Sequence, residues 1–473
     1  MRRPFVCNVT AGNAVAEGGG AVNFPVSGAR STNERPSLYI VWRHDMTKTL
    51  APIGRASGTL SLPGSKSISN RSLLLAALSR GTTTLRGLLD ADDSRVMIAA
   101  LRALGVVIEA TGDDAMVVQG CGGTFPNKTA KLFLGNAGTA LRPLAAVLAF
   151  AGGHYELDGV PRMRERPIAD LVDALNALGA RISYLGQAGY PPFAIEPAAP
   201  PQSSAVEIKG NVSSQFLSSL LMAAPLIAPP GGLRISVAGT LVSQPYVRLT
   251  LDLMARFGVQ VERRENVFHV ERAHYATPGT FVVEGDASGA SYFLALGVIA
   301  GGPIRVTGVG KNSVQGDIGF ARVLEAAGGT ITWGEDWIEA SGSGELRAFD
   351  VDCTDIPDAA MTGAILAGFA HGRSVLRGIG SWRVKESDRI TAMATELRKL
   401  GAKVEEGSDW LAVEGPADWR EVEIDTYDDH RIAMCFSLAA AGGRPVHIRN
   451  PSCVAKTFPD YFDRLAALQT GSV

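Results

Sequence analysis

The sequence has few residues from which a disulfide framework or a metal centre could be built. Its five cysteines are an odd number and contain no CxxC pair, and its seven histidines form no cluster at metal-ligand spacing. This pattern favours reduced, metal-free cysteines in a cytoplasmic protein. The cysteines are Cys7, Cys121, Cys353, Cys435 and Cys453.

An excess of charge of one sign is also missing. The 45 Lys and Arg residues nearly balance the 47 Asp and Glu residues, so no global positive field exists to hold a nucleic acid or an anionic membrane. Apolar runs such as 73–78 and 144–151 are interrupted well before the roughly 20 residues of a membrane span. We therefore expect no nucleic-acid or membrane partner, and any anion site must be local.

The length of the chain indicates more than one hydrophobic core. Its 473 residues exceed the roughly 250–300 over which a single core grows, which predicts two sizeable domains. Residues 1–45 differ from the rest in their glycine run 18–20, scattered arginines and lack of periodicity. We interpret them as a disordered N-terminal extension. The alternative, a plastid-type transit peptide, is disfavoured by the acidic Glu17, Glu34 and Asp45.

One structural unit recurs six times along the chain. A signature of an apolar residue, glycine and a small or apolar residue ends helix-like segments at 104–106, 178–180, 257–259, 327–329 and 400–402, and a sixth helix lies at 461–468. Each unit reads strand, apolar helix, strand, amphipathic helix, strand. The apolar helices should be buried and the amphipathic ones should cover a sheet. The sequence therefore predicts an α/β fold of repeated units.

Each apolar helix begins with polar residues, at 65–71, 135–142, 211–216, 285–292, 355–361 and 426–434. Taken singly, these residues are explained as helix caps. Six helix N-termini packed around a common axis would instead create an anion-binding cleft, because each carries partial positive charge. Lys66, Arg71, Arg142 and Arg431 lie in or beside these turns. The ligand would be a small phosphate or carboxylate.

Five longer motifs give a specific resemblance. The chain resembles the 5-enolpyruvylshikimate-3-phosphate synthase family of enolpyruvyl transferases at LPGSKSISNR (62–71), LFLGNAGTALRPL (132–144), RVKESDR (383–389), DDHRIAM (428–434) and AKTFPDYF (455–462). This resemblance implies two globular domains, each of three repeated α/β units with buried helices and outer sheets, and an active site in the cleft between them. It implies one domain at 65–283 and another that combines 46–64 with 284–473.

The resemblance also implies a reaction. Members of the family transfer the enolpyruvyl group of phosphoenolpyruvate to the 5-hydroxyl of shikimate 3-phosphate and release phosphate, on the route to chorismate and aromatic amino acids. It implies no metal or organic cofactor, and we expect a monomer whose partners are these two small molecules. Both substrates are multiply anionic, which accounts for local cations in a chain of near-zero net charge.

The chemistry requires a base for the substrate hydroxyl and an acid for the vinyl carbon. By resemblance Asp358 is the base, and Lys66 bridges both substrates and stabilises developing charge. Either Glu386 or Lys66 donates the proton, and the sequence leaves this choice open. Without the resemblance, Asp358 is interpreted as a helix cap and Glu386 as an ion-pair partner of Arg389.

Two overlapping sets of binding residues follow from the resemblance. The shikimate 3-phosphate set is Lys66, Ser67, Arg71, Ser213, Ser214, Gln215, Ser243, Tyr246, Asp358, Ser381 and Lys385. The phosphoenolpyruvate set is Lys66, Asn136, Gly138, Arg162, Gln215, Arg389, His430, Arg431 and Lys456. Arginine forks suit phosphate and carboxylate, and Gly138 leaves room for phosphoenolpyruvate or for an analogue such as glyphosate. His430 is alternatively a hydrogen-bonded structural histidine.

Two positions depart from the family pattern. Ser381 stands where many relatives have Asn, so that a substrate contact would be shortened or bridged by water. Gln244 replaces a common Lys and removes one peripheral charge. Neither change touches the expected acid or base.

Two other functions fit the sequence less well. A UDP-N-acetylglucosamine enolpyruvyl transferase is disfavoured, since the first helix begins with Lys66-Ser67 instead of Lys-Asn and Cys121 lies in a Gly-rich turn without an adjacent base. A non-catalytic anion-binding repeat protein has no reason to hold both Asp358 and Glu386 among cations.

Overall fold

The computed structural model describes residues 46–112 and 114–471. The chain divides into the segment Met1–Arg43 and the compact unit His44–Val473, and the described residues belong to the second. The extension expected at 1–45 therefore lies outside the described residues. Within 46–112 and 114–471, none of the helices combines the length and apolarity that crossing a membrane requires.

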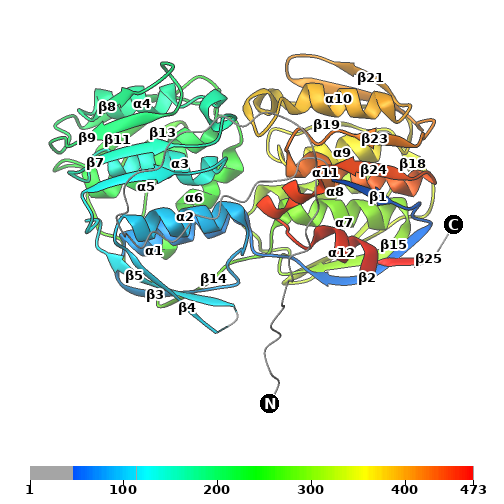
Figure 1. Cartoon of the computed structure of the whole chain (residues 1–473), viewed down its shortest axis with the longest axis horizontal. Coiled ribbons are helices and arrows are strands. Elements are labelled where there is room, and N and C mark those ends of the chain that lie inside the picture. Colours follow the sequence, from blue (N-terminus) through cyan, green and yellow to red (C-terminus); the bar gives the residue numbers. More distant parts are fainter. Residues whose placement is uncertain (1–45, 113, 472–473) are drawn as a thin grey trace, which may run out of the picture. The chain divides into compact units, whose positions relative to one another are not determined.

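The helices are of two kinds, and the two kinds alternate along the chain (Figure 1). Buried apolar helices are α1 (Lys66–Leu78), α3 (Gly138–Leu148), α5 (Ser214–Ile227), α7 (Ala287–Ile299), α9 (Ala360–Ala367) and α11 (His430–Ser437). Between them lie α2 (Asp92–Ala103), α4 (Ala169–Ala177), α6 (Gln244–Arg256), α8 (Phe320–Ala326), α10 (Arg389–Lys399) and α12 (Tyr461–Ala467). Every residue of α9 is buried, and in α1 only Ser67 is not. The predicted burial of the apolar helices is confirmed.

The strands and the short 3-10 helices connect these helices. The strands are β1 (Thr47–Leu50), β2 (Arg55–Ser61), β3 (Arg80–Arg86), β4 (Val107–Thr111), β5 (Ala115–Cys121), β6 (Thr129–Phe133), β7 (His154–Asp158), β8 (Arg181–Tyr184), β9 (Phe193–Glu196), β10 (Ala205–Lys209), β11 (Leu233–Ala238), β12 (Glu262–Arg264), β13 (Val267–Val270), β14 (Thr280–Val282), β15 (Gly301–Thr307), β16 (Thr330–Trp333), β17 (Trp337–Ser341), β18 (Leu346–Arg347), β19 (Asp350–Asp352), β20 (Ala370–Arg377), β21 (Lys403–Glu406), β22 (Trp410–Gly415), β23 (Val422–Ile424), β24 (Val446–Arg449) and β25 (Gln469–Gly471). The 3-10 helices are η1 (Met163–Glu165), η2 (Gly316–Gly319), η3 (Gly380–Val384), η4 (Leu438–Gly442) and η5 (Pro451–Lys456).

The described residues form six sheets built to one plan. Each has a central strand that pairs in parallel with one neighbour and antiparallel with another. The central strands are β3, β7, β11, β15, β20 and β24. The predicted six-fold repetition is therefore present in the sheets as well as in the helices.

A glycine ends five of the covering helices and explains the repeated signature. Gly105, Gly179, Gly258, Gly328 and Gly401 have φ between +83° and +103°, a left-handed conformation that costs other residues about 1 kcal/mol. The next residue donates its N–H back to the helix, as Val106 does to the Leu101 carbonyl at 3.0 Å, which satisfies a carbonyl at the helix end.

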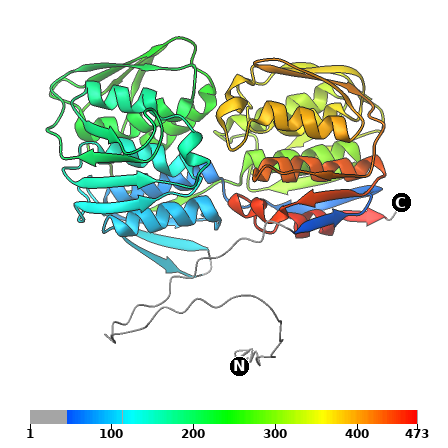
Figure 2. The same ribbon diagram turned by 45° about the horizontal axis from the view of Figure 1, so that its top comes forward.

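The buried apolar side chains form two clusters. One contains residues between Ile68 and Val283, and the other combines residues from Leu50 to Leu60 with residues from Ala287 to Leu468. In Figures 1 and 2 the blue strands β1 and β2 accordingly lie among the red elements, whereas α1 lies with the cyan and green ones. The two chain crossings between the clusters are hydrogen-bonded to each other, since Ser65 N donates to Glu284 O at 2.7 Å and Asp286 N to Pro63 O at 2.9 Å.

Candidate active site

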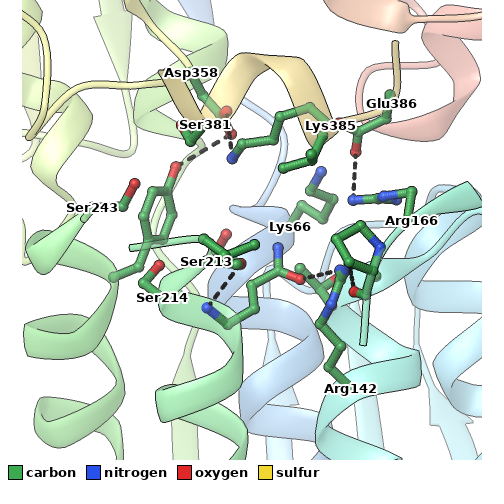
Figure 3. A pocket seen from close by; sticks show the side chains of 18 of the residues that line it. Lys66, Arg142, Arg166, Ser213, Ser214, Ser243, Asp358, Ser381, Lys385 and Glu386 are labelled. Carbon is green, nitrogen blue, oxygen red and sulfur yellow. Dashed lines mark hydrogen bonds and ion pairs between the residues drawn. The ribbon is translucent and has the colours of Figure 1, made fainter. Parts of the chain in front are cut away.

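A polar pocket lies where the N-termini of α1, α3 and α5 face the loops that precede α9 and α10 (Figure 3). Asp358, Ser381, Lys385 and Glu386 approach it from one side, and Lys66 extends between them and the opposite wall. The pocket is lined by Lys66, Ser67, Arg71, Asp93, Gly138, Thr139, Arg142, Arg166, Pro167, Val212, Ser213, Ser214, Gln215, Ser243, Tyr246, Asp358, Ser381, Val384, Lys385 and Glu386. All eleven residues of the shikimate 3-phosphate set are therefore brought together.

The start of α5 shows how local sequence orients the wall. Ser213 caps the helix, because its Oγ accepts a hydrogen bond from Gln215 N at 3.2 Å. The Gln215 side chain accepts a separate hydrogen bond from Arg142 Nη1 at 2.6 Å. Both the serine pair and the amide thus face the pocket from one helix turn.

Asp358 is a buried carboxylate surrounded by cations. Its oxygens lie 3.4 Å from Lys385 Nζ, 3.1 Å from Arg389 Nη1 and 3.0 Å from Arg431 Nη2. Burial alone would raise the pKa of Asp358, but these three cations and Lys66 hold that pKa well below its ordinary value. The side chain makes no cap hydrogen bond to α9, so the helix-cap interpretation of Asp358 is wrong. The group is ionised and can accept a proton.

Glu386 has a similar environment. Its Oε2 accepts from Arg389 Nη2 at 2.9 Å, and its Oε1 lies 3.9 Å from Arg166 Nη2. Burial opposes ionisation, but Arg389, Arg166, Lys66 and Lys456 together hold the pKa of Glu386 well below its ordinary value. The expected ion pair with Arg389 is present, and the carboxyl carries no proton in this arrangement.

Lys66 is buried at the centre of this charge cluster. Its Nζ lies 3.8 Å from Asp93 Oδ2, and the side chain lines both the main pocket and the small cavity beside it. Burial lowers the pKa of Lys66, as do Lys456 and Arg431, while Asp93 and Glu386 oppose this. A desolvated ammonium in this position interacts strongly with any anion that enters.

Asp93 was not predicted as a site residue. It lies in the first turn of α2, where an acidic side chain is ordinarily explained by the helix dipole. In the structure its Oδ1 accepts from Lys456 Nζ at 2.6 Å. A negative charge here holds two cations, Lys66 and Lys456, together.

Arg166 occupies the pocket, and Arg162 does not. Arg162 donates to the carbonyl oxygens of Glu386 and Lys385 at 3.0 and 2.9 Å and pairs with Glu165 at 2.8 Å. Arg166 is only 3% exposed, lines the pocket, and donates to the Asn136 carbonyl and side-chain oxygens at 3.0 Å. The segment 162–166 has arginine at every second position, and the neighbouring residues do not indicate which of these arginines enters the pocket.

Arg142 was noted in the sequence as a cation at a helix start but was placed in neither binding set. It lines the pocket beside Arg166, and its Nη2 donates to Pro167 O at 3.0 Å. Burial and then the charge of Arg166 lower the pKa of Arg142 to about 9. Two desolvated guanidinium groups side by side are suited to a shared anion.

The remaining residues of the phosphoenolpyruvate set lie behind the pocket wall. Arg389 and Arg431 hold Asp358, Arg431 also lines the adjoining cavity, and Lys456 donates to Asn136 O at 2.9 Å. His430 is fully buried, and within the described part of the chain neither of its ring nitrogens has a hydrogen-bond partner. The nearest acceptor is Asp429 Oδ1, which lies 3.5 Å from His430 Nδ1, so the interpretation of His430 as a hydrogen-bonded structural histidine stays a prediction. Burial lowers its pKa well below the ordinary value, so the ring is neutral.

Of the two positions that depart from the family pattern, one lies in the pocket and the other does not. Ser381 lines the pocket, whereas Gln244 lies outside it and accepts from Arg263 Nη2 at 3.2 Å. Cys121 ends β5 away from the pocket, and the four cysteines of the described residues are unpaired. The described ranges contain no group of three His, Cys, Asp or Glu side chains arranged for a metal ion.

Comparison with known proteins identifies the family. The family model described as EPSP synthase (3-phosphoshikimate 1-carboxyvinyltransferase) matches residues 50–465. Proteins named 3-phosphoshikimate 1-carboxyvinyltransferase are similar to the chain over most of its length. The relative from Cupriavidus necator is 56% identical over 429 residues, which cover 89% of this chain and 99% of the relative. The relative from Bordetella petrii is 59% identical over 429 residues, covering 88% and 96%.

Solved structures show the same fold. A structure of EPSP synthase from Acinetobacter baumannii gives a TM-score of 0.73 at 26% identity and covers 89% of this chain and 98% of that chain. The enolpyruvyl transferase NikO from Streptomyces tendae gives 0.71 at 19% identity, with 90% and 98% covered, which supports the fold alone. The predicted enolpyruvyl transferase fold is confirmed. The chain thus belongs to the EPSP synthase family, the enzymes that transfer the enolpyruvyl group of phosphoenolpyruvate to shikimate 3-phosphate and release phosphate.

Proposed function

We propose that the pocket around Lys66 is where this chain performs the transfer, with Asp358 as the base. The supporting observation is that Asp358, Glu386 and Lys66 line one pocket together with cations and serine hydroxyls. Two carboxylates among cations suit a reaction that moves protons between anionic substrates.

Shikimate 3-phosphate is assigned to the end formed by α1, α5 and α6. Ser213 and Ser214 offer hydroxyls at a helix N-terminus, which suits a phosphate. Arg71 is held there by Thr250 Oγ1 at 2.8 Å and Ser67 O at 3.0 Å. Asp358 and Lys385 face this end from across the pocket, where the carboxylate can accept the hydroxyl proton of the substrate.

Phosphoenolpyruvate is assigned to the end formed by Gly138, Arg142 and Arg166. We assign to Arg166 the role that the sequence suggested for Arg162, because Arg166 lines the pocket and the guanidinium of Arg162 is already occupied. The neutral ring of His430 and the cations Arg389, Arg431 and Lys456 support this end from behind. Asn136 acts by holding two of the cations through its carbonyl oxygen.

The proton donor to the vinyl carbon is Glu386 or Lys66. In the pocket without substrates Glu386 is ionised because four cations surround it. An entering phosphate and carboxylate offset those cations and raise the affinity of Glu386 for a proton. Lys66, whose pKa burial lowers, lines the same wall and is the second candidate donor.

We further propose that the two apolar clusters are two domains, 65–283 and 46–64 with 284–473, and that the protein acts as a monomer in the cytoplasm. The separation of the buried apolar side chains into two clusters supports the two domains. The relatives named above come from bacteria. Light scattering of the purified protein tests the monomer, and a mass of two chains would contradict it.

Replacing Gly138 by alanine tests which substrate lies at the Gly138 end. A Cβ there would collide with Arg142 Nη1 and lie 3.0 Å from Arg166 Nη2, so the guanidinium groups must shift. We expect the KM for phosphoenolpyruvate to rise about tenfold and the inhibition constant of glyphosate to rise further, while the KM for shikimate 3-phosphate stays within about twofold. Steady-state kinetics measure all three values.

The matched control is Gly186→Ala, since Gly186 lies outside the pocket and a Cβ there meets its nearest atom at 3.4 Å. It should leave the kinetics unchanged. An increase confined to the KM for shikimate 3-phosphate in Gly138→Ala would reverse the proposed assignment of the two ends.

A further inference from the structure

Asp317 is a buried carboxylate with no role in the site described above. It lies in η2, is 5% exposed, and lines the small cavity beside Tyr246 instead of the substrate pocket. Its oxygens accept from Tyr246 Oη at 3.1 Å, from Ser288 Oγ and from Ala359 N at 3.4 Å. Across the part of the chain that the structure describes, no cationic side chain pairs with it, whereas Asp358 has three such partners.

The hydroxyl of Tyr246 lies between Asp317 and Asp358. Its oxygen is 3.1 Å from Asp317 Oδ2 and 3.3 Å from Asp358 Oδ2. Burial and the two carboxylates raise the pKa of Tyr246 well above its ordinary value, so the phenol keeps its proton. A hydroxyl has one proton to donate, and therefore Tyr246 can serve only one of the two carboxylates at a time.

The charge of Asp317 changes within an accessible pH range. Burial, followed by the charge of Asp358, raises the pKa of Asp317 to about 6. The hydrogen bond from Ser288 opposes this rise. The titratable groups that face Asp317 are Tyr246 from α6, Asp286 before α7, Asp358 before α9, Arg431 from α11 and Lys66 from α1. The polar side chains of Ser65, Ser67, Ser288 and Gln315 line the same cavity. Arg431 also lowers the pKa of Asp317, but burial and the charge of Asp358 outweigh it, so Asp317 loses its charge in mild acid.

We propose that Asp317 is a positioning residue for the transfer, which decides through Tyr246 whether Asp358 receives an additional hydrogen bond. The inference rests on the role of Asp358 as base that is proposed above. When Asp317 is ionised, Tyr246 donates to it, and the Oδ2 atom of Asp358 is left with less stabilisation of its charge. When Asp317 is protonated, Tyr246 donates to Asp358, which stabilises the carboxylate and makes it a weaker base.

The activity should fall in acid. Below the pKa of Asp317 the weaker-base arrangement dominates, so kcat falls as the pH falls through about 6. The phosphates of both substrates titrate near the same pH, but they affect every variant equally. The pH dependence of kcat reports the groups that titrate in the enzyme–substrate complex. A difference in this dependence between the variants and the unmodified enzyme is therefore due to Asp317.

Asp317→Asn is the first test, because the amide cannot ionise and fixes Tyr246 toward Asp358. We expect kcat at pH 7 to fall about tenfold, which corresponds to lowering the pKa of the base Asp358 by about one unit. The KM for shikimate 3-phosphate should stay within about twofold. The part of the acid limb in kcat that belongs to Asp317 should disappear. A role in packing alone would lower the melting temperature and leave the shape of the pH profile unchanged.

Ser288→Ala is the second test and perturbs the fold less. It removes a hydrogen bond that stabilises the charged form of Asp317, so the acid limb of kcat should move to higher pH. Asp350→Asn is the matched control. Asp350 is an exposed aspartate of β19 and pairs with Arg377 at 2.8 Å. Its pH profile should coincide with that of the unmodified enzyme.

The outcomes separate this inference from the proposed role of Asp358. An acid limb that stays at the same pH in Ser288→Ala, or that persists unchanged in folded Asp317→Asn, overturns the inference about Asp317. If Asp358→Asn is inactive in that case, the base assignment still stands. If Asp358→Asn remains active, the base assignment itself fails, whatever Asp317 does.

Discussion

Asp358→Asn will lower kcat about a thousandfold, within the range that general bases contribute, while the Kd for shikimate 3-phosphate changes by less than about threefold. The amide keeps the size of the side chain but cannot accept the hydroxyl proton. Removing the charge also leaves Lys385, Arg389 and Arg431 without a shared partner, so the affinity for an anionic substrate should not fall. Phosphate release measures the expected fall in kcat, and calorimetry measures the Kd for shikimate 3-phosphate.

The control for this variant is Asp355→Asn. Asp355 lies in the same loop, but its side chain is exposed and pairs with the exposed Arg248 at 3.7 Å. Its kinetics should stay within about twofold of the unmodified enzyme, because such surface pairs contribute little. Turnover close to normal in Asp358→Asn would remove Asp358 from the mechanism.

Arg166→Gln will raise the KM for phosphoenolpyruvate about a hundredfold, which corresponds to losing one partner of a buried charge pair. Arg162→Gln, four residues earlier, should change the same constant by less than about fivefold. The difference is expected because Arg166 is buried and faces the pocket. The guanidinium of Arg162 instead donates hydrogen bonds to Glu165 and to two backbone carbonyls.

The pair is informative because the two substitutions are chemically identical and close in sequence. Steady-state kinetics with phosphoenolpyruvate as the varied substrate measure both constants. The opposite order of effects would restore the assignment of Arg162 that the sequence suggested and would place Arg166 in a structural role.

Most of the fold could be predicted because its signals are local and repeated. The glycine after each covering helix is required by its positive φ, as at Gly105 and Gly401, and this requirement recurs in five of the six units. The burial of α9 follows from its lack of charged residues, and that of α1 from its apolar run 73–78. Such features depend on a few neighbouring residues, so a single sequence contains them.

The missed site residues depend on contacts between distant segments. Asp93 lies 363 positions from its partner Lys456, and nothing near it in the sequence separates it from an ordinary first-turn aspartate. Arg166 is distinguished from Arg162 only by the path of the chain through η1. Asp317 acquires its raised pKa from burial and from Asp358, which lies on another loop. Residue type alone does not contain this information.

The most direct test is phosphate release from phosphoenolpyruvate by the purified protein, with shikimate 3-phosphate or UDP-N-acetylglucosamine supplied in parallel as the acceptor. We expect release with shikimate 3-phosphate and none with the nucleotide sugar. Release with the nucleotide sugar alone, or with neither acceptor from folded protein, would contradict the assignment of this chain as an enzyme that transfers enolpyruvyl to shikimate 3-phosphate.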